Sequence, residues 1–184
     1  MKKVTMKDFR WLGKPQIWQK TYKDLTLTVE GKLCLPDGPL LLAVSDEDFI
    51  LSLDITTPPQ GGFCGLCLYH TEHSYISVGR SRTDLLIESS SLHSRTTSTI
   101  ALPTDQESIQ WHLERTGTQV RIGCADGSEG QVQWVCSTTM AGMQDSISFG
   151  PFFSNYTSVP FEAMMHGMRY AKRAEQTLVQ PPLI

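Results

Sequence analysis

The chain has 184 residues, which suits one domain with a sizeable core and is short for two. A hydrophobic content of 40%, a net charge of −3 and a sequence pI of about 5.9 are those of an ordinary globular protein and argue against a strongly basic nucleic-acid binder. No apolar run approaches the roughly 18 residues of a membrane span. Charged residues follow the basic start, where a signal peptide would need an apolar core, so we predict a cytoplasmic protein with no membrane partner.

The segment before Asp24 combines basic side chains with aromatic ones. Basic and aromatic residues together are a pattern used to bind single-stranded nucleic acid. The same residues also fit a first strand that its aromatic side chains anchor to the fold, while the lysines stay in water. Because the pI is acidic, we favour the anchored strand and expect no nucleic-acid partner. The aromatic residues are Phe9, Trp11, Trp18 and Tyr22.

Hydrophobic residues at every second position, broken by turn residues, predict a succession of short strands. The clearest stretch is 48–79, where a Pro-Pro-Gln-Gly-Gly turn and a polar turn separate three such segments. Helical segments do not alternate with the strands, so the pattern predicts an all-β fold, an antiparallel two-sheet β-sandwich, rather than a parallel sheet. The predicted strands are 25–29, 40–44, 49–55, 63–69, 75–79, 84–88, 109–115, 120–124, 132–134, 147–149 and 161–165.

Two further segments complete the expected organisation. Residues 89–99 are rich in Ser, Thr and His and include Arg95, which predicts a polar loop or an edge strand suited to the rim of a binding face. Residues 169–178 have helical composition, and the Pro-Pro pair at 181–182 ends any order soon afterwards. We therefore predict a single domain over 1–184, with its core at about 9–170 and a C-terminal tail at 171–184.

Several of these segments are similar to a known family. They are Phe9–Pro15, Leu25–Val29, Asp48–Leu51, Gly65–Tyr69, Tyr75–Gly79, Trp111–Arg115, Phe149–Phe153 and Phe161–Ala163. The set resembles concanavalin A-like lectin and glucanase sandwiches, closest to the family similar to the yeast regulator of enolase and to the C-terminal domain of β-xylosidases. The resemblance consists of core and turn residues, and it implies a jelly-roll, concanavalin A-like sandwich. Where the family tends to carry Trp-Leu-Lys, this chain has Tyr75-Ile76-Ser77.

The five cysteines do not form a disulfide framework, because their number is odd and their spacing irregular. Cys64 and Cys67 make a C-x-x-C pair inside a predicted strand, where an offset of three points the two side chains to opposite faces. No second C-x-x-C completes a zinc site. We expect buried thiols in a core.

The alternative function, a glycosidase-like enzyme, would depend on carboxylate side chains. A retaining glycosidase needs two carboxyl groups about 5 to 5.5 Å apart, and jelly-roll glucanases supply them from one Glu-x-Asp-x-x-Glu strand. That motif is absent. Asp48 with Asp54, or Glu88 with Glu114, could still converge in space. An enzyme acting on a small sugar or glycoside is therefore the alternative function, and its catalytic residues are not assigned.

No metal or cofactor is expected. His70 and His73 lie three positions apart at a hairpin turn, a spacing typical of neither a cupin sheet nor a zinc helix, so we interpret them as solvated turn residues. Asp126 and Glu129 could offer oxygen ligands to calcium, but no loop has the ligand density of a calcium motif.

A binding face is predicted on the strands around 63–80. Phe63 and Tyr69 share one side of their strand, opposite Cys64, Leu66 and Leu68. They would either form an aromatic platform for a ligand or cover the second sheet. The candidate ligand-binding residues are Phe63, Tyr69, Tyr75, Arg80, Arg82, His112 and Glu114.

The leading hypothesis is a non-catalytic carbohydrate-recognition or accessory protein. It follows from the fold resemblance together with the missing catalytic motif, and the expected partner is a carbohydrate or sugar derivative. A glycosidase-like enzyme predicts a deep site with two carboxyl groups within about 10 Å. A protein-interaction or regulatory module predicts an exposed apolar patch instead. The ligand and the oligomeric state are not assigned.

Overall fold

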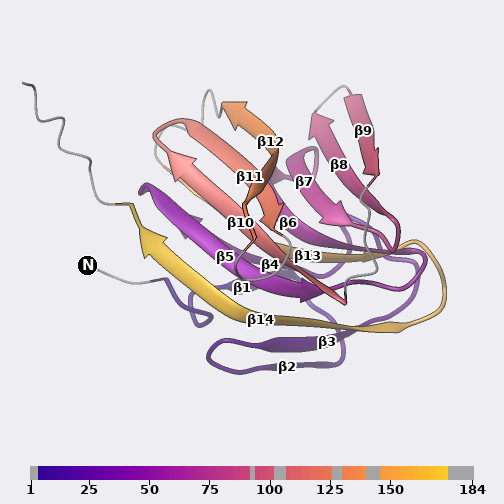
Figure 1. The fold of residues 1–184 in the computed structure, drawn as a ribbon. Coiled ribbons are helices and arrows are strands. Elements are labelled where there is room, and N and C mark those ends of the chain that lie inside the picture. Colours follow the sequence, from indigo (N-terminus) through magenta and orange to yellow (C-terminus); the bar gives the residue numbers. More distant parts are fainter. Residues whose placement is uncertain (1–3, 92–93, 102–106, 126–129, 140–145, 174–184) are drawn as a thin grey trace, which may run out of the picture.

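Two antiparallel sheets pack face to face in the computed structural model (Figure 1). The structure describes residues 4–91, 94–101, 107–125, 130–139 and 146–173. Each sheet has seven strands, and no helix occurs in these ranges. Nothing in the same ranges forms a helix that could span a membrane. The predicted all-β, antiparallel two-sheet sandwich is confirmed.

The two sheets are called sheet A and sheet B below. Sheet A has the strand order β1 (Arg10–Gly13), β4 (Leu40–Ser45), β13 (Ile147–Asn155), β6 (Gly62–Thr71), β7 (Ser74–Arg80), β8 (Asp84–Ser91) and β9 (Ser94–Ala101). Sheet B has the order β12 (Gln133–Thr139), β11 (Gln119–Ala125), β10 (Ser108–Thr116), β5 (Phe49–Thr56), β14 (Phe161–Lys172), β3 (Leu25–Val29) and β2 (Trp18–Lys20). All neighbouring strands pair antiparallel, so short turns suffice to join consecutive ones such as β6 and β7.

The main core lies between the sheets, and the period of two in the sequence builds it. Alternate residues of β5 are buried, as are those of β3 and the first half of β14. The aromatic centre is Phe49, whose ring stacks on Phe149 at 4.4 Å and on Tyr170 at 5.1 Å between centroids. Burying one such large side chain stabilises the fold by roughly 1.5 to 3 kcal/mol.

A second apolar cluster lies on the outer face of sheet A. It contains Leu35, Leu40, Phe63, Cys67, Tyr75 and Phe152, from four strands and one loop. Leu35 belongs to the loop 30–39, which is held along β13 by the hydrogen bond from Asn155 N to Leu33 O at 2.7 Å. Gly79 leaves room for this cluster, because a Cβ there would lie 2.7 Å from the rings of Phe152 and Phe63. The loop 30–39 therefore covers one end of this outer face, whereas the outer face of a sheet is ordinarily exposed to solvent.

The N-terminal aromatic residues mostly anchor the segment, as predicted. Phe9 is buried against Phe149 in an edge-to-face contact with 6.1 Å between centroids. Trp11 packs on Trp18 at 5.7 Å. Tyr22 differs, because its side chain is exposed.

The C-terminal segment differs from the prediction. Residues 169–172, expected to begin a helix, are the last part of β14 and pair with β5 from Arg169↔Ser52 to Lys172↔Phe49. Tyr170 is buried in the core there, and this pairing and burial outweigh the intrinsic helix preference of the segment. The sandwich thus extends past 170, and the remainder of the predicted helix and tail, 174–184, lies outside the described residues.

Candidate ligand-binding face

Glu88 lies on the outer face of sheet A, in β8, the strand next to the edge strand β9. In β8 it has the same orientation as Leu86, and its pairing partners are Ser77 on β7 and Thr97 on β9. Despite pointing away from the core, its side chain is almost fully buried. Burial of a carboxylate is costly unless a partner compensates the charge, so its surroundings decide what this face can do.

Arg95 on the edge strand β9 is the charge partner of Glu88. Its Nε donates to Oε1 of Glu88 at 3.0 Å, and its Nη2 donates to the same oxygen. No described residue donates to the other oxygen, Oε2. Partial burial lowers the pKa of Arg95, but the hydrogen bond and charge of Glu88 outweigh it, and the pKa lies above its ordinary value. Arg95 therefore stays charged at neutral pH, and one oxygen of its partner carboxylate has no donor among the described residues.

Two tyrosines and a thiol surround this ion pair. Burial, then the charge of Glu88, raises the pKa of the hydroxyl of Tyr75. The same two causes raise the pKa of Tyr156 strongly, and that of Cys34 as well. All three groups therefore stay protonated at neutral pH. They come from β7, from the connection after β13 and from the loop 30–39, so three separate parts of the chain converge on Glu88.

Ser77 adds a hydroxyl without a partner. It is fully buried on the same outer face, beside Cys67 and Glu88 in the pairing of β6, β7 and β8. Its Oγ makes no hydrogen bond in the described structure. Leaving a buried hydroxyl unsatisfied costs roughly 1 to 3 kcal/mol, which a fold does not ordinarily retain without a use for the group.

These residues make up the surface called the Glu88 face below. It offers one free carboxylate oxygen, a guanidinium, an aliphatic hydroxyl and two phenols, next to apolar ring surface. Such a set can hold a small polar ligand by directed hydrogen bonds, because a few polar groups on an otherwise apolar surface fix the orientation of a ligand. The Glu88 face is Cys34, Tyr75, Ser77, Glu88, Arg95 and Tyr156.

Three of the predicted ligand-binding residues lie on this outer face of sheet A. Tyr75 belongs to the Glu88 face itself, and Tyr69 is its partly exposed partner across β6 and β7. Phe63 is buried, with Phe152 at 4.8 Å and Tyr156 at 6.3 Å between ring centroids. The alternative in which Phe63 and Tyr69 cover the second sheet is wrong, because Cys64, Leu66 and Leu68 do so. A binding role for all three stays a prediction.

Arg80 and Arg82, also predicted to bind the ligand, do not lie with Tyr75 on the outer face of sheet A. Arg80 ends β7 with the same orientation as Val78, so its side chain is buried on the inner side, where its charge acts on Cys124 of sheet B. Arg82 is exposed in the turn between β7 and β8. Strand alternation accounts for the position of Arg80, since residues 75 and 80 are an odd number of positions apart and must point to opposite faces.

His112 and Glu114 also lie elsewhere, on the outer face of sheet B. Trp111 and Leu113 face the core from β10, so these two side chains point away from it, on the far side of the molecule from Glu88. Glu114 accepts from Arg121 through Oε2 and from Arg173 through Oε1. This second surface is called the Glu114 face and consists of His112, Glu114, Arg121, Trp134 and Arg173.

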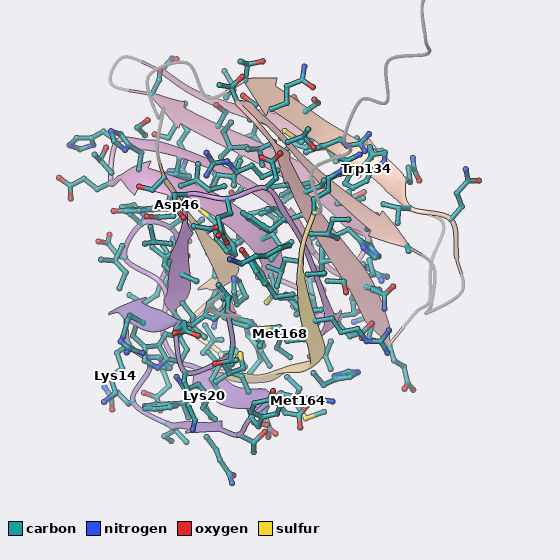
Figure 2. All side chains as sticks on the ribbon, turned by 90° about the vertical axis from the view of Figure 1, so that its left-hand side faces the viewer. Lys14, Lys20, Asp46, Trp134, Met164 and Met168 are labelled. Carbon is teal, nitrogen blue, oxygen red and sulfur yellow. The ribbon has the colours of Figure 1, made fainter. Side chains whose placement is uncertain are left out.

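Trp134 of β12 completes the Glu114 face. The guanidinium of Arg121 lies 4.1 Å from the centroid of its ring. Figure 2 shows Trp134 toward the upper right, on the side of the molecule formed by β10, β11 and β12. Every strong polar group of the Glu114 face has a partner, in contrast to Glu88 and Ser77.

The carboxylates do not form the pairs that the enzymatic alternative requires. Glu88 and Glu114 lie on opposite outer faces. Asp48 and Asp54 are six positions apart along one strand direction, roughly 20 Å, and Asp48 accepts from Gly117 N at 2.7 Å. Asp84 shares the orientation of Glu88 but is four positions away, roughly 13 Å, beyond the 6.5 to 9.5 Å of even an inverting glycosidase.

A hollow of about 480 Å³ beside the N-terminal segment holds other carboxylates, among them Asp46, which Figure 2 labels. Glu47 there pairs with Lys172, and Asp8 accepts from Thr5 N at 2.8 Å. No aromatic residue lines this hollow. It therefore lacks the platform expected of a sugar site.

Metal ligands do not gather in the part of the chain that the structure describes. No group of three or more His, Cys, Asp or Glu side chains is arranged to hold an ion there. The ring Nε2 of His73 lies 3.3 Å from the carboxylate of its neighbour Glu72, and both side chains are exposed. Asp126 and Glu129, named as calcium ligands, lie outside the described residues. All five thiols are unpaired, and Cys64 and Cys67 point to opposite faces of β6 as predicted.

Sequence reasoning missed most of the Glu88 face. The polar segment 89–99 was expected to form a rim, and Arg95 lies in it, now seen as the end of β8 and the edge strand β9. Alternation in 84–88 would also have placed Glu88 opposite Leu85 and Ile87, hence outward. Tyr156 and Cys34 carry no such signal, because they belong to connections rather than to strands.

Comparisons with known proteins find likeness in structure only. No family model matches the sequence, and no curated protein matches it. A functionally unknown protein from Saccharomyces cerevisiae has a TM-score of 0.78 and 11% identity, with 93% of this chain and all of that chain covered. The GH43 protein BlXynB from Bacillus licheniformis has a TM-score of 0.74 and 10% identity over 90% of this chain and 37% of that one. The carbohydrate-binding module CBM66 from Bacillus subtilis has a TM-score of 0.56 and 12% identity, with 89% and 94% covered.

At such low identities this likeness shows the fold alone. It agrees with the β-sandwich and with the resemblance to xylosidase domains stated from the sequence. The link to the family of the yeast regulator of enolase and the jelly-roll, concanavalin A-like class stay predictions. The chain spans little more than a third of the GH43 protein BlXynB, so nothing of that whole protein's activity follows for this one.

Proposed function

We propose that the protein is a non-catalytic carbohydrate-recognition or accessory protein and that its ligand binds on the Glu88 face. The observation that carries the proposal is the ion pair between the buried Glu88 and the half-exposed Arg95 beside Tyr75 and Tyr156, with one carboxylate oxygen and the Ser77 hydroxyl left unused. The structural likeness to sugar-related proteins supports it at the level of the fold.

The residue types on this face suit a sugar. Carboxylate and guanidinium groups are planar and form charge-assisted hydrogen bonds, which fix the direction of approach of ligand hydroxyl groups. Tyrosine offers an apolar ring to the carbon–hydrogen surface of a sugar and a hydroxyl at its edge. Tyr156 and Arg95 are partly exposed while Glu88 is nearly buried, so the ring and the guanidinium are reachable from solvent and Glu88 forms the deeper part.

The carboxylate geometry supports recognition without hydrolysis. Among the outward residues of sheet A in the described ranges, Asp84 and Glu88 are the strand carboxylates nearest this face, and Thr83 holds Asp84 at 2.7 Å. Roughly 13 Å between them is longer than the distance between the two carboxyl groups of a glycosidase. We also place the protein in the cytoplasm, because its unpaired cysteines suit a reducing compartment.

The test is a titration of the protein with a panel of methyl glycosides at millimolar concentration, followed by NMR chemical shifts. Arg95→Ala and Arg121→Ala form a matched pair, since each arginine pairs with a buried glutamate on one outer face. We expect the first to abolish binding and the second to leave it unchanged. Binding lost only in Arg121→Ala would move the site to the Glu114 face, and no binding by any sugar would end the proposal.

A further inference from the structure

We infer that the Glu88 face recognises a neutral sugar ring through two adjacent hydroxyl groups and discriminates against sugar phosphates and uronic acids. This inference rests on the proposed function and names the ligand class for that same site. Its basis is the pairing of two unused polar atoms on neighbouring strands, the Oε2 of Glu88 and the Oγ of Ser77, within a locally neutral set of charges.

The free oxygen of Glu88 and the remaining N–H groups of Arg95 together require a ligand group that can both donate and accept a hydrogen bond. A carboxylate oxygen only accepts, so its partner on the ligand must carry a hydrogen. The remaining N–H groups of Arg95 only donate, so their partner must carry a lone pair. A hydroxyl satisfies both, and the serine hydroxyl and the two protonated phenols can match it in either role.

The spacing of the two atoms favours adjacent hydroxyls on one ring. Ser77 and Glu88 are direct partners across β7 and β8, where side chains on one face start about 4.5 to 5.5 Å apart. Glu88 is nearly buried and the Oγ of Ser77 is covered by other atoms, so binding requires the covering side chains to move aside and admits only one edge of a ligand. Two neighbouring hydroxyls on one edge of a sugar ring can meet both side chains together.

Local charge argues against an acidic ligand. The ionised groups that act on Cys34 in this region are Glu88 and Asp37, and against them Arg95 and Lys32. Two negative and two positive groups create no net attraction for an anion. Arg95 already gives two N–H groups to Glu88, so a phosphate or carboxylate would lie beside the free Oε2 and be repelled by it.

Ser77 distinguishes a ligand-binding role from a structural one. Because its Oγ has no partner, Ser77→Ala removes no hydrogen bond from the free protein and should leave the urea unfolding midpoint unchanged or raised. It should weaken sugar binding several-fold. The control is Ser154→Ala, which removes another buried, unpartnered hydroxyl of the same face, beside Phe63 and four positions along β6 from Cys67. We expect that variant to bind as the parent does.

The experiment compares methyl glucoside, galactoside and mannoside with the matching 6-phosphates and uronic acids by calorimetric or NMR titration. We expect a neutral glycoside to bind, its acidic derivatives to bind at least about tenfold more weakly, and its Kd to change less than about twofold between roughly 0.05 and 0.5 M salt. Equal or tighter binding of a phosphate or uronate, or a Ser77→Ala variant that binds normally, would overturn the inference and leave the proposed function standing. If neither neutral nor acidic sugars bind, the proposed function fails with it.

Discussion

Each outer face of the sandwich carries a glutamate–arginine ion pair, and the two pairs have different roles. On each, a buried glutamate meets an arginine seven positions later across a hairpin, Glu88 with Arg95 through β8 and β9, and Glu114 with Arg121 through β10 and β11. The side chains are 6% and 49% exposed in the first pair and 7% and 43% in the second. Sequence spacing and burial therefore do not tell the two pairs apart.

The difference lies in what surrounds each pair. On the Glu114 face, Arg173 donates to the second carboxylate oxygen and the ring of Trp134 lies over Arg121, so the residue that follows β14 is held to β10. On the Glu88 face the second oxygen is unused. A closed set of bonds stabilises the fold, whereas an open set costs stability and is retained for a ligand.

The largest expected effect is on folding stability and tests this division directly. Glu114→Gln leaves two guanidinium groups beside a neutral amide, and allowing for their partial exposure we expect a loss of about 2 kcal/mol in the free energy of unfolding. Glu88→Gln leaves one half-exposed guanidinium and should cost about 1 kcal/mol. Urea unfolding of both variants measures the difference. Equal losses would mean that the two faces are not distinguished in the way we describe.

A second comparison uses the two aromatic residues at the edges of these faces. Tyr156 is 39% exposed and Trp134 is 37% exposed, so truncation removes similar accessible surface. Tyr156→Ala should weaken sugar binding about tenfold, which corresponds to about 1.4 kcal/mol. Trp134→Ala should leave binding unchanged and lower stability by about 0.5 to 1 kcal/mol through the lost contact with Arg121. Weaker sugar binding by Trp134→Ala and unchanged binding by Tyr156→Ala would place the ligand on the Glu114 face instead.

Strand alternation made much of this fold predictable, and its failures have physical reasons. Alternation states which side of its own strand a residue occupies, and this placed Tyr69 with Phe63 correctly. It does not state to which sheet the strand belongs, which is why it groups Glu114 with Tyr75 although the two lie on opposite outer faces. Residues on connections, such as Tyr156, depend on how two distant segments meet and leave no periodic signal.

The Glu88 face should contribute to the loss of stability at alkaline pH, alongside buried groups elsewhere such as Cys64 and Tyr170, whose pKa values burial also raises. The pKa values of Tyr75 and Tyr156 are raised by burial and by Glu88, so the folded protein keeps phenolic protons that the unfolded chain releases near pH 10. Their contribution is complete below about pH 10 and is lost as the pH rises above it. Tyr156→Phe should flatten this decline, measured as the unfolding midpoint between about pH 9 and 11. An unchanged slope would show that Tyr156 ionises freely in the folded state.

The smallest expected effect is on folding stability at acid pH, and it concerns His112 on the Glu114 face. Burial lowers the pKa of His112, and the charge of Asp54 opposes this only in part. The unfolded chain therefore takes up a proton near pH 6.5 that the folded protein still excludes, so this contribution is complete above about pH 6.5 and is lost as the pH falls. His112→Gln keeps a polar side chain beside Gln110, whose Oε1 lies 3.1 Å from the ring Nε2, and should remove this part of the pH dependence. Sugar affinity of the parent should not change between about pH 5.5 and 7, because His112 faces away from Glu88. A sugar affinity that followed the protonation of His112 would join the two faces into one functional unit.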